Sequence, residues 1–159
     1  AKQRPADLAL PVLLADAEGA AHVALDLSPC ARRLMDAFWP GALTVVMRKS
    51  DLVPDAVTAG RRTVGLRVPD WDFTRRVLAA CGGVLAVTSA NLSGAPPPRE
   101  LGQVPDALLA HVALIIDAGP CPGGVPSTVV DLTADPPRVL REGAIAGGRI
   151  TQVLEQHDG

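Results

Sequence analysis

A short apolar run that leads into a polar loop constrains the fold of this chain more than any other part of its sequence. Residues 84–87 read VLAV, follow two glycines, and continue into residues 88–98, which read TSANLSGAPPP. Four apolar residues between turn-forming residues predict a buried strand, and the three prolines prevent that strand from continuing. We therefore expect residues 84–87 to form a buried strand of a sheet. Hydroxyl and amide groups should lie at its edge, where open α/β sheets usually bind ligands.

Strand-like and helix-like segments follow one another irregularly along the rest of the chain. Apolar runs predict strands at residues 8–15, 43–47, 63–68, 112–117, 127–132 and 139–142. Helical spacing and start signals predict helices at residues 17–25, 29–38, 72–81, 100–110 and 148–156. Several strands are adjacent in sequence, so an α/β fold with a twisted mixed sheet, flanked by helices, is expected instead of a strict β-α-β repeat.

Local signals sharpen some of these predictions. Ser28 is a favourable N-cap for the helix of residues 29–38, and Asp16 could cap the helix before it. The 72–81 helix is expected to bury one apolar side, formed by Phe73, Val77, Leu78 and Cys81. Residues 112–117, VALIID, are expected to form a buried strand, and Pro11 suggests an edge or a bulge.

Length and composition favour one globular domain over residues 1–159. The chain has 48% apolar residues, and its net charge of −2 disfavours a nonspecific duplex binder. Only four aromatic residues are present, which weakens any case for stacking nucleic-acid bases.

Cysteine usage and hydropathy indicate a cytoplasmic protein. The three cysteines are far apart and form no CxxC pair, so neither a disulfide framework nor a zinc site is indicated. No apolar run approaches the roughly 20 residues that a membrane span needs. We expect no membrane partner.

Four basic residues stand beside predicted strand ends or turns. Lys2 and Arg4 are near the start, Arg67 lies in an otherwise apolar strand, and Arg141 lies at the end of the last strand. An arginine fork can donate two parallel hydrogen bonds to a carboxylate or a phosphate. For each of the four taken alone, a surface salt bridge remains the commoner explanation.

Two clusters of hydroxyl residues follow strands or glycines. One includes Ser89 and Asn91, and the other is Ser127-Thr128, after a glycine- and proline-rich loop. Such residues let backbone amides approach a phosphate, although they more often cap turns. No histidine has a convincing catalytic setting, and GxSxG, Walker A and GxGxxG patterns are absent. No resident metal site is predicted.

Six motifs, taken in order, resemble the YrdC/Sua5 family of threonylcarbamoyl-AMP synthases. They are KQRP at 2–5, FWPGALTVV at 38–46, GLRVPD at 65–70, TSANLSG at 88–94, PSTVVDL at 126–132 and LREGAI at 140–145. Each motif is weak alone, but six in this order are highly specific. The resemblance covers nearly the whole chain and implies a YrdC-like twisted mixed sheet with a concave, positively lined cleft.

The resemblance also implies a nucleotidyltransfer reaction. L-Threonine, bicarbonate and ATP, accompanied by Mg²⁺, would give L-threonylcarbamoyladenylate and pyrophosphate. The product would feed N6-threonylcarbamoylation of adenosine 37 in tRNA by a downstream transferase, and binding of double-stranded RNA or tRNA is possible. Adenylyl transfer can rely on positioning and charge neutralisation, which suits a chain without a recognisable nucleophile.

Site roles follow from the family's K-x-R…S-x-N signature and the other matching motifs. The implied catalytic residues are Lys2, Arg4, Ser89 and Asn91. The implied ATP-binding residues are Lys2, Arg4, Thr63, Asn91 and Arg141. The implied threonine-binding residues are Arg67, Ser89 and Ser127.

Relative to the family, the chain is expected to be N-terminally incomplete. Members carry a segment with PTET- and VYGL-like motifs before the K-x-R motif, and this segment helps to build the threonine pocket. Two other functions remain open at this point. One is a catalytically inactive YrdC-like module that binds RNA. The other is a carbamoyl-adenylating domain of a larger carbamoyltransferase.

Overall fold

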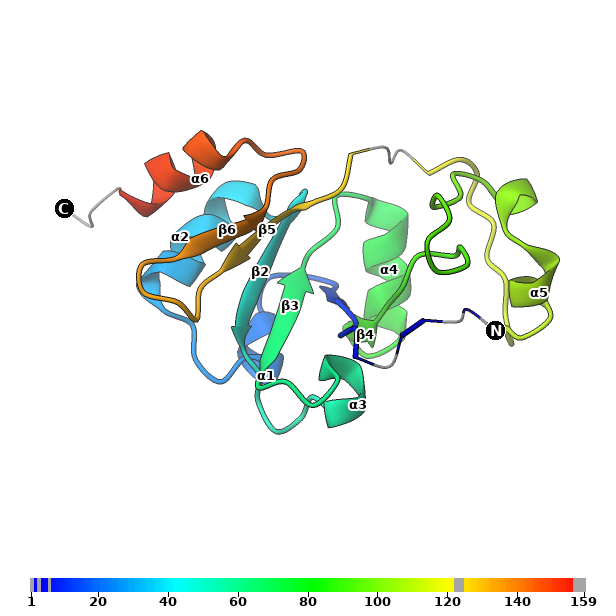
Figure 1. The fold of residues 1–159 in the computed structure, drawn as a ribbon, viewed down its shortest axis with the longest axis horizontal. Helices are drawn as coiled ribbons and strands as arrows, with labels where there is room; N and C mark the ends of the chain where they lie inside the picture. Colours follow the sequence, from blue (N-terminus) through cyan, green and yellow to red (C-terminus); the bar gives the residue numbers. More distant parts are fainter. Residues whose placement is uncertain (1, 3, 6, 122–124, 156–159) are drawn as a thin grey trace.

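One mixed sheet organises the molecule. The structure is a computed structural model, and it describes residues 2, 4–5, 7–121 and 125–155. The strands are β1 (Val12–Leu14), β2 (Leu43–Arg48), β3 (Thr63–Arg67), β4 (Val84–Ala86), β5 (Thr128–Asp131) and β6 (Arg138–Arg141). Their order across the sheet is β4-β1-β3-β2-β5-β6 (Figure 1). The β1–β3 and β2–β5 pairs are parallel and the other pairs are antiparallel, which confirms the predicted mixed sheet.

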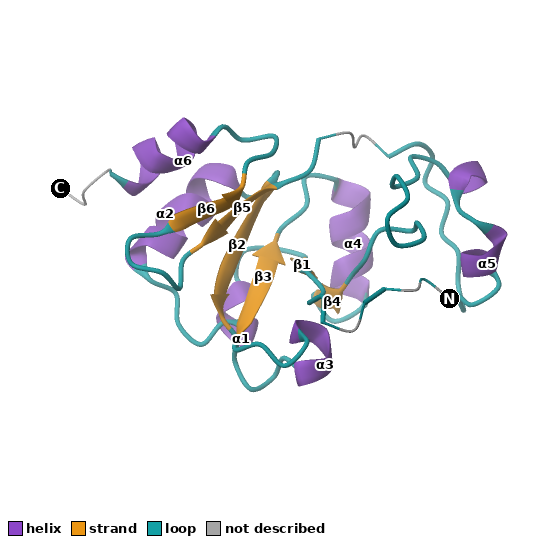
Figure 2. Ribbon diagram, in the orientation of Figure 1, coloured by secondary structure: helices purple, strands orange, loops and turns teal. Residues whose placement is uncertain are grey.

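Helices flank this sheet unevenly. They are α1 (Ala20–Val23), α2 (Pro29–Phe38), α3 (Asp55–Thr58), α4 (Asp72–Ala80), α5 (Asp106–Leu109) and α6 (Gly147–Leu154), with a 3₁₀ turn at Leu101–Gln103. Helices α2 and α6 pack together beside β2, β5 and β6, whereas α4 packs against β1 and β4 (Figure 2). Helix α5 lies at the far end of the molecule from α6 (Figure 1). No helix within the described ranges is long and apolar enough to cross a membrane.

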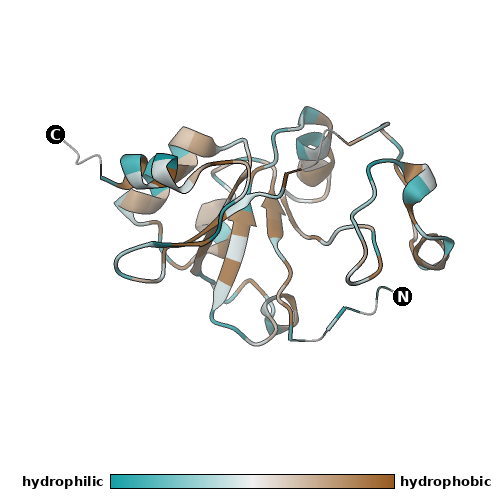
Figure 3. Cartoon of the chain, turned by 45° about the horizontal axis from the view of Figure 1, so that its top comes forward, coloured by the Kyte–Doolittle hydropathy of each residue, from teal (hydrophilic) through white to brown (hydrophobic). Residues whose placement is uncertain are grey.

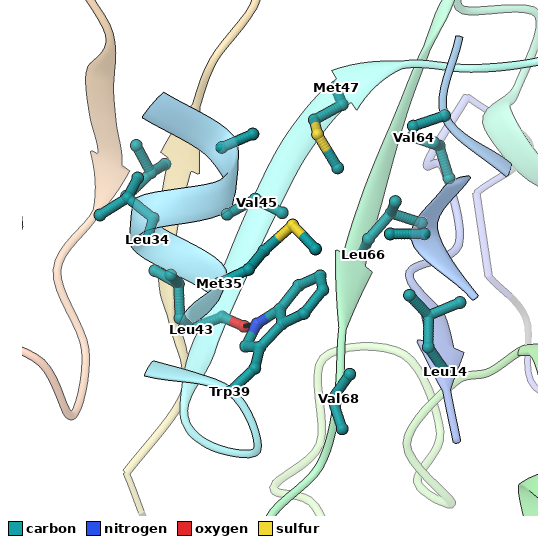
Figure 4. Packing of buried hydrophobic residues seen from close by; sticks show 14 of the residues in the cluster. Leu14, Leu34, Met35, Trp39, Leu43, Val45, Met47, Val64, Leu66 and Val68 are labelled. Carbon is teal, nitrogen blue, oxygen red and sulfur yellow. Dashed lines mark hydrogen bonds between the residues drawn. The ribbon is translucent and has the colours of Figure 1, made fainter. Parts of the chain in front are cut away.

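The core lies between α2 and the middle of the sheet. The Ser28 hydroxyl accepts a hydrogen bond from the Ala31 amide at 3.2 Å, so the predicted cap is confirmed. Leu34 and Met35 are both buried, and Met35 points from α2 towards β2 (Figure 4). Just after α2, the Trp39 indole nitrogen donates to the Leu43 carbonyl at 2.8 Å, which satisfies its one polar group inside the core. In Figure 3 the central strands carry strongly hydrophobic segments, while the helices alternate between hydrophobic and hydrophilic residues.

Elements near the N-terminus are shorter than predicted. The strand of residues 8–15 reduces to β1, because Pro11 has no amide hydrogen for the ladder and the strand begins after it. β1 has neighbours on both sides, so the predicted edge position is wrong. The helix of residues 17–25 reduces to α1, and the Asp16 carboxylate accepts from the Gly19 amide without capping that helix.

Predictions for residues 70–121 require more correction. Strand β4 is only half-buried, because it is the edge strand of the sheet and one side lacks a neighbouring strand. Helix α4 buries Leu78 alone, while Phe73 is 38% exposed and Cys81 is exposed. The 100–110 helix divides into a 3₁₀ turn and α5, since Pro105 interrupts the helical hydrogen bonds.

Residues 112–117 form no strand. Each of these residues is exposed, and Leu114 is 74% exposed. They pair with no strand that the structure describes, and an apolar segment without a packing partner stays in contact with solvent. Apolar sequence alone therefore gave a wrong prediction here.

Candidate functional site

The strand alternation of β2 and β3 sets a group of polar side chains on the sheet face opposite the core. Val64 and Leu66 are 2% and 0% exposed in the core, so Thr63, Gly65 and Arg67 face the other way. A Cβ atom added at Gly65 would lie 3.4 Å from the Thr44 methyl carbon. Thr44 therefore shares this polar face with Arg67.

Arg67 has a guanidinium that is held at one end and free at the other. Its Nε donates to the Gly41 carbonyl at 2.7 Å. Within the described residues, its two terminal nitrogens make no hydrogen bond. Burial lowers the pKa of Arg67, and the carboxylate of Asp70 raises it only in part. The side chain remains a cation whose fork is available to a carboxylate or a phosphate.

The turn that accepts the Arg67 hydrogen bond depends on a glycine. A Cβ atom at Gly41 would clash with the Phe38 carbonyl oxygen at the end of α2. The Gly41 amide donates to the Val68 carbonyl at 2.9 Å, just after Arg67. The turn at Gly41 thus holds the Nε end of the Arg67 guanidinium through its backbone carbonyl.

Ser127 and Arg141 come together beside this group. Arg141 donates to the Ser127 carbonyl from Nη2 at 2.9 Å and from Nε at 3.2 Å. Its Nη2 is also 3.3 Å from the Ser127 hydroxyl. The same hydroxyl lies 2.8 Å from the Thr44 hydroxyl, and each of these two residues is 8% exposed.

A buried threonine fixes the segment that carries Arg141. The Thr128 hydroxyl donates to the Ile145 carbonyl at 2.6 Å and accepts from the amides of Gly143 and Ile145 at 2.9 and 3.0 Å. Gly143 lies so close to Pro126 that an added Cβ would clash with the Pro126 carbonyl oxygen. Thr128 is fully buried, so the ends of β5 and β6 are tied together from within the protein.

Lys2 contacts the polar loop after β4. Its ammonium donates to the Asn91 carbonyl at 2.7 Å, to the Asn91 side-chain oxygen at 3.1 Å, and to the carbonyl and hydroxyl of Ser89. Burial lowers the pKa of Lys2, and the positive charge of Arg4 lowers it further. The structure thus joins three residues of the K-x-R…S-x-N signature. The Arg4 guanidinium instead donates to the nearby carbonyls of Leu8 and Ala9.

A cavity of about 480 Å³ lies next to this loop. It is lined mainly by apolar residues of α4 and of residues 97–121, and Ser89 is the predicted site residue among them. No lysine or arginine lines it. The cationic groups at Lys2, Arg67 and Arg141 therefore lie outside this cavity.

Sequence reasoning did not single out Thr44, Gly41 or Thr128 as functional residues. The signal for Thr44 was its polarity, because it is the one polar residue in the apolar run 43–47 and lies between the buried Leu43 and Val45. Nothing local indicated that the Thr128 hydroxyl would meet the backbone 15 and 17 residues later. Among the described residues, no group of three or more histidine, cysteine or acidic side chains could hold a metal ion.

Comparisons with known proteins identify relatives of this chain. Residues 1–143 match the family model Sua5_yciO_yrdC, described as "Telomere recombination". Threonylcarbamoyl-AMP synthases from Pyrococcus abyssi and Bacillus subtilis are 37% and 39% identical over 97% of this chain. The chain spans 45% of the length of each of these two relatives.

A solved structure of a relative has the same fold. The crystal structure of P. abyssi Sua5 complexed with L-threonine has a TM-score of 0.90 and 36% sequence identity. The match covers 97% of this chain and 45% of that one. The order of motifs, the mixed sheet and these similarities agree that the chain belongs to the Sua5/YciO/YrdC family.

Proposed function

We propose that the protein takes part in the synthesis of L-threonylcarbamoyladenylate from L-threonine, bicarbonate and ATP. The observation that carries this proposal is the half-buried Arg67 guanidinium with its two terminal nitrogens unbonded among the described residues. A cation that is desolvated without a full partner is costly unless an anion completes the site. The carboxylate of an amino acid matches the geometry of that fork.

Two further features support an amino acid in this position. Ser127 lies on the same polar face, where its hydroxyl is 2.8 Å from that of Thr44. Relatives at 37% and 39% identity are named threonylcarbamoyl-AMP synthases, and a solved relative is complexed with L-threonine. Threonine is accordingly the amino acid that we propose for Arg67, Ser127 and Ser89.

The proposed reaction needs no side-chain nucleophile. The threonine amine attacks the carbon of bicarbonate, a C–N bond forms, and water leaves to give a carbamate. A carbamate oxygen then attacks the α-phosphorus of ATP, the bond to the β-phosphate oxygen breaks, and pyrophosphate leaves. Such a displacement depends on orientation and on neutralising the charge of the leaving group.

Basic side chains of this chain would neutralise charge during the attack on ATP. Lys2, already bound to Ser89 and Asn91, and Arg141, held against Ser127, would face the phosphates. Mg²⁺ bound to ATP would add further charge neutralisation when present. The downstream use of the product in tRNA modification is part of the same proposal.

The direct test is exchange of labelled pyrophosphate into ATP. We expect exchange to require L-threonine and bicarbonate together. Arg67→Ala should lower exchange at subsaturating threonine by about 100-fold, because a charge-assisted pair with the carboxylate is lost. Arg76→Ala is the matched control, since that guanidinium is 80% exposed on α4 and pairs only with Asp72 among the described residues. Exchange without threonine, or equal exchange in the two variants, would contradict the proposal.

A further inference from the structure

The Thr44 hydroxyl makes a hydrogen bond that the fold does not require. Thr44 lies in β2, and its hydroxyl contacts the Ser127 hydroxyl at 2.8 Å, which is its one hydrogen bond within the described part of the chain. Two positions later, Val46 occupies the same sheet face without any hydroxyl. Valine is β-branched like threonine and both are favoured in strands, so the hydroxyl is unnecessary for strand pairing at this position.

The number of hydrogen bonds that Ser127 can make indicates a role for the Thr44 hydroxyl. A serine hydroxyl has one hydrogen to donate and two lone pairs that accept. Arg141 can only donate, so its contact with the Ser127 oxygen at 3.3 Å uses one lone pair. If Thr44 donates as well, the second lone pair is used, and the Ser127 hydrogen must point elsewhere. If Ser127 donates to Thr44 instead, it has no hydrogen left for a ligand.

We infer that Thr44 is a positioning residue that makes the Ser127 hydroxyl a donor towards the bound amino acid. This inference rests on the proposed function. With Thr44 and Arg141 both donating, the Ser127 hydrogen is directed to an acceptor oxygen of threonine beside Arg67. Thr44 and Ser127 are each 8% exposed, so little water competes for these hydrogen bonds.

The experiment compares threonine affinity in isosteric variants of the 159-residue chain. Thr44→Val should weaken L-threonine binding, measured by calorimetry, by about tenfold, which is the usual effect of losing one buried hydrogen bond. Thr44→Ser keeps the hydroxyl and should restore affinity to within about twofold of the wild type. ATP affinity should remain unchanged in Thr44→Val, which a general loss of structure would not allow.

Thr58→Val is the matched control. Thr58 is buried like Thr44, but its hydroxyl contacts only the Asp55 carbonyl in the described structure, at 3.4 Å in α3. We expect that variant to bind threonine like the wild type. If Thr44→Val does not fold, Thr44→Ala replaces it, with the same expected loss of threonine affinity and recovery in Thr44→Ser.

A double-mutant cycle tests whether Thr44 acts through Ser127. In a Ser127→Ala background, Thr44→Val should cause no additional loss of threonine affinity. Additive losses, or a Thr44→Val variant that binds threonine normally, would overturn the inference while leaving the proposed function standing. A wild-type chain that binds no threonine would overturn both.

Discussion

Two regions of this molecule have similar apolar content but very different burial. In the packed region, formed by α2, α6, β2, β3 and β5, residues such as Leu34, Leu43 and Leu66 are completely buried. In the open region, residues 84–121, no residue is buried, and each of residues 111–120 is exposed. Apolar runs become a core only where another element covers them, and among the described elements few cover residues 84–121.

The same difference separates the two halves of the candidate site. Ser127 and Thr44 belong to the packed region, and the fully buried Thr128 hydroxyl fixes the backbone around them. Ser89 and Asn91 belong to the open region, where Lys2 supplies contacts that are exposed or half-buried. We therefore expect rigid preorganisation around Ser127 and a looser arrangement around Ser89.

The largest expected effect comes from truncating one leucine in each region. Leu34→Ala should lower the free energy of unfolding by about 4 kcal/mol, because a fully buried side chain leaves a cavity. Leu114→Ala, at a site that is 74% exposed, should change it by less than about 0.5 kcal/mol. Urea denaturation measures both. Similar losses in the two variants would show that residues 84–121 are packed after all.

A backbone contact gives the next largest effect. Gly143→Ala should cost about 3 kcal/mol, since the new methyl group would lie 2.6 Å from the Ser127 carbonyl carbon and force the two segments apart. Gly148→Ala in α6 has open space and should be neutral or stabilising. Thermal unfolding compares the stability of these two variants. A Gly143→Ala variant as stable as Gly148→Ala would refute a rigid connection between β5 and residue 143.

After Leu34→Ala and Gly143→Ala, the substitution with the smallest expected effect on stability is Lys2→Met. Lys2→Met keeps the aliphatic stem but removes the donors to Ser89 and Asn91, so exchange of backbone amide hydrogens in residues 88–95 should accelerate. Global stability should fall by less than about 1 kcal/mol, because the contacts are partly exposed. Arg76→Met, at an exposed position on α4, should leave that exchange unchanged. Unaltered exchange in Lys2→Met would mean that the loop holds its shape by itself.

The packed region was also the part that sequence patterns predicted best. Helix α2 has a capping serine, a proline at its first position and one apolar face, and all three signals act within a few residues. β3 shows an alternation that matches its two faces, and β2 was predicted from its β-branched residues. Residues 112–117 have equally strong apolar character, yet they form no strand, because strand formation requires a partner that local sequence does not reveal.

For the candidate site too, residues within sequence motifs were predicted, whereas a contact between distant strands was not. Motif resemblance selected Lys2, Ser89 and Asn91, which the structure brings into contact, and Ser127 with Arg141, which are also in contact. The roles given to these residues remain predictions. The Thr44–Ser127 pair joins residues 83 positions apart, and only the parallel pairing of β2 with β5 places them side by side.

The two tryptophans lie in different environments, so their fluorescence can report on different parts of the molecule. Trp39 lies in the core against Leu43, whereas Trp71 is half-buried at the start of α4, with its ring 5.7 Å from that of Phe73 and against the cavity beside Ser89. The chain contains no tyrosine, so these two indoles dominate its near-ultraviolet emission. A protein with Trp71→Phe would emit from the core, and one with Trp39→Phe from the cavity wall. Paired spectra could thus follow ligand entry and global unfolding as separate signals in one unlabelled chain.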